Sequence, residues 1–141
     1  MSLSSVQSPP ILASGRERVN VVLRYVVTVV CAGSASVHAT LVPAHLDKGG
    51  LPLGLAFAGS AVALTADALT VRTPRHDSWA PASAGAVLAL VAAAYVLSRT
   101  VGIPLLVPEP ERLETLGALT TGTEVVGAVA AVMLTTGRNK T

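Results

Sequence analysis

The sequence predicts an all-α membrane protein: a bundle of four transmembrane helices that run up-down-up-down, with both termini in the cytoplasm. The 141 residues are 51% hydrophobic and only 13% charged, about half the charged fraction usual in soluble proteins. Several apolar stretches are about 20 residues long, the length that a helix needs to cross a hydrocarbon core of about 30 Å. Positively charged residues are unevenly distributed between these stretches, and this asymmetry predicts the orientation.

The spans that we expect are approximately residues 20–42, 51–71, 80–101 and 115–136. Together they form one transmembrane domain, 20–137, between a flexible N-terminal tail, 1–19, and a short C-terminal tail, 138–141. Pro43 and the pair Gly49-Gly50 are expected to end the first span, and Pro81 lies just inside the third, where helices tolerate proline. A β-barrel is excluded because these stretches do not alternate between apolar and polar residues.

The basic residues gather in three segments: before the first span, between the second and third spans, and in the C-terminal tail. They are Arg16, Arg18, Arg24, Arg72, Arg75, Arg138 and Lys140. By the positive-inside rule these segments face the cytoplasm, so we expect a multi-pass protein of the plasma membrane. One alternative stays open, in which the first span is a cleaved signal peptide with an apolar region at 25–30 and a cleavage zone at 32–36.

Composition excludes several classes of function. A net charge of +2 is too small for a basic surface that binds nucleic acid. The single cysteine, Cys31, excludes a disulfide framework and any metal site with several cysteines. The sequence also contains no nucleophile elbow, phosphate-binding glycine loop or zinc-protease helix, so it does not predict an enzyme.

Ionisable residues inside the spans are the candidate functional residues, because burying them in lipid is costly. Glu124 lies about nine residues into the fourth span. An ionised and unpaired carboxylate there is unfavourable, so we expect Glu124 to be protonated, paired or bound to a cation. A structural alternative is an ion pair that locks the bundle, for example with Arg99. For Arg99 itself, the alternatives are a side chain that reaches the surface from the helix end or a contact with an anion or with Glu124.

Two histidines lie near the outer end of the first span. His38 and His45 are seven residues apart, which is about 10.5 Å along an unbroken helix. They could therefore share a ligand only if Pro43 bends the helix. With such a bend, His38, His45 and Glu124 could bind a transition metal or haem. Alone, His38 is more often a histidine that hydrogen-bonds a neighbouring hydroxyl or carbonyl. The predicted outer-side polar site consists of His38, His45, Arg99 and Glu124.

These residues also resemble a pattern found in known membrane proteins. The two histidines, the run Ser98-Arg99-Thr100-Val101-Gly102-Ile103-Pro104 and Glu124 resemble the pattern in a group of uncharacterised small four-span bacterial integral membrane proteins. Some members have an acidic residue soon after the second histidine, where this chain has Asp47. The similarity covers approximately residues 20–136. It implies a common architecture and a shared outer site, but no reaction.

Alanine and glycine are abundant in the expected spans, and small residues let helices approach closely in lipid. This composition favours a tight bundle, a homo-oligomer or docking on a larger membrane complex. The sequence is compatible with three alternative functions. The first is an accessory or structural membrane protein with a polar site near the outer face. The second is a metal- or haem-binding redox module that uses His38, His45 and Glu124. The third is a small oligomeric transporter or proton-conducting protein centred on Glu124.

Overall fold

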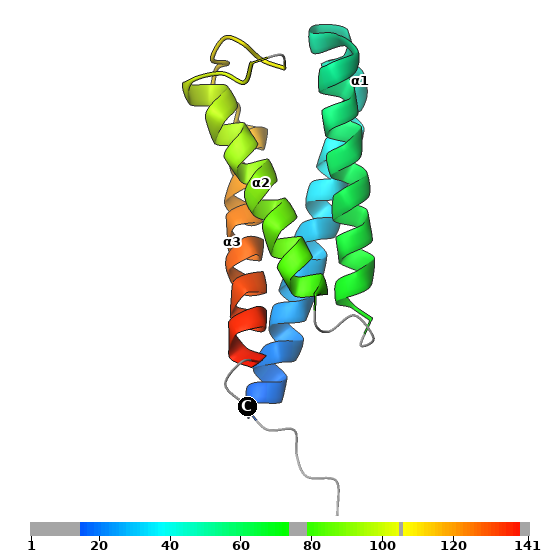
Figure 1. Cartoon of the computed structure of the whole chain (residues 1–141), viewed down its shortest axis with the longest axis vertical. Helices are drawn as coiled ribbons and strands as arrows, with labels where there is room; N and C mark the ends of the chain where they lie inside the picture. The colour runs from blue at the N-terminus through cyan, green and yellow to red at the C-terminus, as the bar shows by residue number, and fades with distance from the viewer. Residues whose placement is uncertain (1–14, 74–78, 105, 139–141) are drawn as a thin grey trace, which may run out of the picture.

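The computed structural model describes residues 15–73, 79–104 and 106–138. Within these ranges the chain is all-helical and has no strand: α1 is Gly15–Val71, α2 is Ala80–Thr100 and α3 is Thr115–Arg138 (Figure 1). The predicted N-terminal tail lies outside the described residues up to residue 14, and α1 already begins at Gly15. Arg75 and Lys140, two of the residues used to predict orientation, also lie outside the described ranges.

The prediction of four helices is wrong, because the described residues form three, and α1 alone is 57 residues long. The expected connection between the first two spans is helical instead of a loop. Pro43 removes one backbone donor, but the helix continues past it and leaves helical geometry only at Gly50, with φ 66° and ψ −162°. Glycine adopts such a positive φ without steric cost. Gly50 alone therefore reverses the direction of the chain, a role that the sequence analysis assigned to a non-helical connection between two spans.

At Gly50 helix α1 folds back on itself, so that its first arm (residues 15–49) and second arm (51–71) lie side by side (Figure 1). The Arg24 guanidinium donates a hydrogen bond from Nη1 to the carbonyl oxygen of Val71 at 3.0 Å. These residues are 47 positions apart and would be separated by about 70 Å in a straight helix. Next to the bend, a Cβ at Gly54 would overlap the Leu46 side chain, so the close approach of the arms requires glycine there.

The hydrophobic core lies toward the end of the bundle that holds the chain termini. Val27, Leu64, Leu88 and Ala131 are fully buried in it. Helices α2 and α3 approach closely here, since a Cβ at Gly85 would lie 3.1 Å from the Cβ of Ala131. Small residues at the helix contacts allow this packing, as in other membrane bundles.

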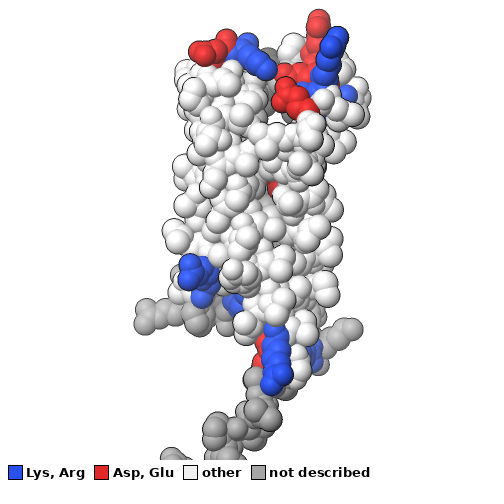
Figure 2. All heavy atoms as spheres, turned by 180° about the vertical axis from the view of Figure 1, so that it is seen from behind, with Lys and Arg blue, Asp and Glu red and all other residues white. Residues whose placement is uncertain are grey.

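All three described helices are long and apolar enough, by length and composition, to cross a membrane. Figure 2 shows the same property on the surface: the charged side chains gather at the two ends, and a broad band between them is almost free of charge. The described chain is therefore compatible with a membrane protein, in which this band would face the hydrocarbon core.

Candidate functional site

A cavity of about 310 Å³ lies in the half of the bundle opposite the chain termini. Both arms of α1, helices α2 and α3 and the segment 101–114 contribute to its walls. The walls are mostly apolar, with side chains such as Leu41, Leu53, Phe57, Val91 and Leu116. All four residues of the predicted polar site, His38, His45, Arg99 and Glu124, line this one cavity.

Glu124 is the most deeply buried of the four, with 1% of its surface exposed. The Ser34 hydroxyl, on the first arm of α1, donates a hydrogen bond to Glu124 Oε1 and so links α1 to α3. Among the described residues, Oε2 has no hydrogen-bond partner, and no Lys or Arg pairs with this carboxyl group. One turn further along α3 the cavity ends, because a Cβ at Gly127 would lie 2.7 Å from Val30 Cγ1 and 2.9 Å from Leu88 Cδ1.

Both histidines use Nδ1 to bind the backbone of their own helix. His38 Nδ1 lies 2.9 Å from the carbonyl oxygen of Ser34, and His45 Nδ1 lies 2.8 Å from that of Leu41. A carbonyl oxygen only accepts, so we assign a proton to Nδ1 of each ring, which leaves Nε2 as the ring nitrogen that can contact a ligand.

Phe57, on the second arm of α1, contacts both rings, and the sequence analysis did not single it out. Its ring is stacked on His45 with centroids 3.6 Å apart and lies 5.2 Å from His38. One signal was available in the sequence, since Phe57 is the only phenylalanine in the chain.

The predicted metal set is not supported. No three His, Cys, Asp or Glu side chains in the described ranges lie close enough together to hold a metal ion. The expected bend at Pro43 is missing because the helix continues to Gly49. The two histidines therefore stay two helical turns apart on one arm, and haem ligation by them has no further support.

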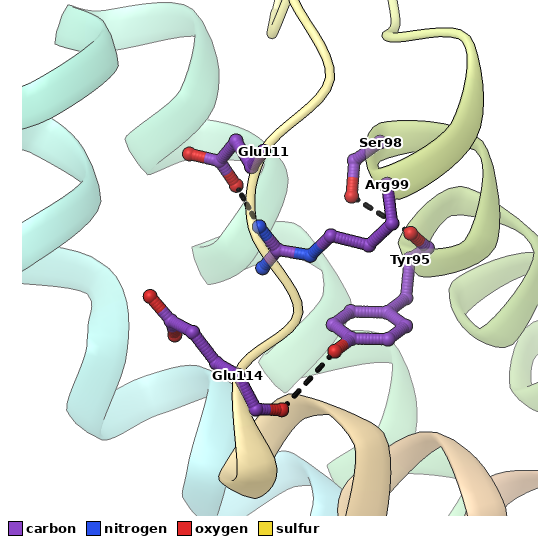
Figure 3. Close-up of polar contacts among 5 residues, drawn as sticks. All are labelled: Tyr95, Ser98, Arg99, Glu111 and Glu114. Atoms are coloured by element: carbon purple, nitrogen blue, oxygen red, sulfur yellow. Dashed lines mark hydrogen bonds and ion pairs between the residues drawn. The ribbon is translucent and has the colours of Figure 1, made fainter.

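Arg99 does not pair with Glu124, and it does not extend into solvent. Its side chain is only 11% exposed, and Nη1 donates to Glu111 Oε2 at 2.7 Å (Figure 3). The guanidinium carbon lies 4.9 Å from the centre of the Tyr95 ring, a cation–π distance. Nε of Arg99 is buried and has no hydrogen-bond partner among the described residues. Neither Glu111 nor Tyr95 was among the residues that the sequence analysis predicted for the site.

The segment 101–114, which we call the covering segment, lines the cavity with Ile103, Leu106 and Val107. Its fold requires glycine at position 102, where φ is 77° and a Cβ would lie 2.8 Å from the Val107 oxygen. The Ile103 amide donates to the Val107 carbonyl at 2.6 Å, and the Glu111 amide donates to the Ser98 carbonyl at 3.0 Å. Tyr95 adds a bond from its hydroxyl to the Glu114 carbonyl at 3.2 Å (Figure 3). The backbone bond from Glu111 to Ser98 and the bond from the Tyr95 hydroxyl thus connect the covering segment to α2.

Comparison with known proteins found no matching family model, no matching curated protein and no matching solved structure. The resemblance to small four-span bacterial membrane proteins therefore stays a prediction. The cavity and its polar groups are the basis on which a function can be argued.

Proposed function

We propose that this chain is an accessory, non-catalytic membrane protein that binds a small and largely apolar molecule in the cavity. The observation that carries the proposal is the convergence of a few polar groups on one mostly apolar cavity of about 310 Å³. Binding sites for small molecules typically have volumes of about 300–1,000 Å³, apolar walls and a small number of polar groups that fix orientation. Buried ionisable groups in membrane spans are themselves indicators of function.

Transport or proton conduction centred on Glu124 has less support. A conducting path would have to continue from Glu124 toward the other end of the bundle. At the next turn of α3, however, Val30 and Leu88 pack against Gly127, and the fully buried residues Val27 and Leu64 belong to the core of that half. The arrangement favours a site that is closed at its inner end, as a binding protein requires.

The experiment compares two phenylalanine substitutions on α2. Ala94 lines the cavity, so Ala94→Phe places a ring inside it, whereas the neighbouring Ala93 is exposed and is not a lining residue. The probe is the neutral alcohol biphenyl-4-ylmethanol. Its binding is measured by equilibrium dialysis against protein in lipid nanodiscs, and binding to empty nanodiscs is subtracted.

We expect saturable binding to the wild type and to Ala93→Phe, and at least about tenfold weaker binding to Ala94→Phe, because the introduced ring overlaps the ligand. Equal binding to all three proteins would place the probe elsewhere and contradict the proposal. The absence of saturable binding to the wild type would also contradict it.

A further inference from the structure

We propose that the ligand of the cavity is a protonated organic amine with an apolar body, bound with its ammonium group against Glu124. This inference rests on the proposed function and names the chemical class of the ligand. Three features of the cavity carry it: the balance of charge, the balance of hydrogen-bond donors and acceptors, and the apolar walls.

The charged residues that line the cavity are predominantly acidic. Three carboxyl groups, of Glu111, Glu114 and Glu124, face one guanidinium, of Arg99. Arg99 already pairs with Glu111 at 2.7 Å, so its charge is matched before any ligand enters. The described lining residues offer Glu124 no Lys or Arg, and His38 is the titratable lining residue that interacts with it electrostatically. In a low-dielectric cavity an unmatched carboxylate attracts a cation more strongly than it would in water.

The hydrogen-bond groups near Glu124 are predominantly acceptors. Both histidines use Nδ1 to bind backbone carbonyl oxygens, so each ring has only Nε2 left for a ligand, and Nε2 accepts a hydrogen bond when the ring is neutral. The Ser34 hydroxyl donates to Glu124 Oε1, and Oε2 is left without a donor among the described residues. An ammonium group has three donors and no acceptor, which complements this set. Among the described lining residues, the buried donor without a partner is Arg99 Nε, and it lies on a guanidinium whose charge is already matched by Glu111.

The apolar walls accommodate the rest of the molecule. Leu53, Phe57, Val91 and Leu116 line the cavity together with other aliphatic residues. A carboxylate ligand of the same shape would fit these walls equally well, but its charge would repel Glu124. A neutral ligand would leave the buried carboxyl group without a charge partner. Charge, rather than shape, should therefore decide which ligand binds.

The test uses three ligands with the same biphenyl body and different charge: biphenyl-4-ylmethylammonium, biphenyl-4-ylmethanol and biphenyl-4-carboxylate. Affinities are measured by equilibrium dialysis for the wild-type chain in lipid nanodiscs, after subtraction of binding to empty nanodiscs. We expect the ammonium ligand to bind at least about tenfold more tightly than the alcohol, because a charge-assisted hydrogen bond is substantially stronger than a neutral one. We expect the carboxylate ligand to bind most weakly.

Glu124→Gln keeps the shape of the side chain and removes its charge. This variant should lower the affinity for the ammonium ligand by at least about tenfold and change the affinity for the alcohol by no more than about twofold. The ligand series on the wild type remains decisive if this variant fails to fold.

Equal affinity for the ammonium and alcohol ligands, or tighter binding of the carboxylate, would overturn the inference. If the alcohol still binds and Ala94→Phe abolishes its binding, the proposed function survives that result. If Ala94→Phe abolishes the binding of none of the three ligands, the proposed function fails as well.

Discussion

The two halves of the bundle are packed very differently although the same helices build both. The half near the chain termini, which we call the packed half, contains Val27, Leu64, Leu88 and Ala131, all 0% exposed. The opposite half, which we call the open half, contains the cavity of about 310 Å³. Toward the open half, α2 diverges from the second arm of α1 (Figure 1). In the packed half, small residues allow close approach, as at Gly85, where an added Cβ would lie 3.1 Å from the Cβ of Ala131.

This difference suggests a division of roles. Helices in lipid associate through close packing, because lipid chains are as apolar as the side chains that they would replace. The packed half therefore supplies most of the stability, and the open half can hold polar groups and an empty volume that would weaken a uniform bundle. Substitutions of the same kind in the two halves should accordingly have unequal effects.

The largest expected effect is that of truncating a leucine. Leu64 is 0% exposed in the packed half, so Leu64→Ala should lower the free energy of unfolding by about 2–5 kcal/mol through lost contacts and a new void. Leu53 is also buried, at 7%, but borders the existing cavity. Leu53→Ala should cost less than about 2 kcal/mol, because a side chain next to a void has fewer contacts to lose. Reversible unfolding in mixed micelles measures both values. Equal losses would remove the distinction between the halves.

A second prediction concerns the closed end of the cavity. A methyl group at Gly127 would lie 2.7 Å from Val30 Cγ1 and 2.9 Å from Leu88 Cδ1, whereas one at Gly122 would meet nothing within 4 Å. We expect Gly127→Ala to destabilise the protein by about 1–3 kcal/mol, the usual cost of overpacking. Gly122→Ala, the matched control on the same helix, should be neutral or slightly stabilising, because alanine favours the helix. Thermal unfolding compares the stability of the two variants with that of the wild type. If Gly127→Ala is as stable as the wild type, the helices around Gly127 separate easily to admit the methyl group, which contradicts the prediction.

The sequence predicted the helical class because long apolar stretches with little charge permit little else in a membrane. It predicted the number of helices wrongly, because Pro43 and the glycine pair were expected to begin a non-helical connection, whereas within α1 only Gly50 leaves helical geometry. Sequence patterns show where a helix is weakened, but whether it ends depends on its tertiary contacts. Here the arms of α1 meet where Gly54 packs on Leu46, and this close contact accompanies a reversal at one residue.

The candidate site was predicted in part. The cost of burying ionisable groups identified His38, His45, Arg99 and Glu124, and all four line the cavity. Their partners were not predictable, because hydrogen bonds between distant segments leave no periodic signal. Ser34 bonds Glu124 from 90 positions away, and the partner of Arg99 is Glu111, 12 positions further along the chain. Phe57 was missed although it is the only phenylalanine in the chain, because its contacts with the two histidine rings depend on how the arms of α1 lie together.

The smallest expected effect belongs to the ion pair between Arg99 and Glu111, which lies at the covering segment of the open half. Glu111 is 36% exposed, so solvent screens the pair, and exposed pairs typically contribute about 0.2–1 kcal/mol. A double-mutant cycle with Arg99→Gln and Glu111→Gln, read out as the free energy of unfolding, isolates the coupling between the two side chains. A small coupling is expected although the distance is only 2.7 Å, because the Glu111 amide also bonds Ser98 and holds the segment without the charge. A coupling above about 3 kcal/mol would instead place this pair among buried ion pairs. In that case the covering segment would depend on the guanidinium, and the open half would be held together as firmly as the packed half.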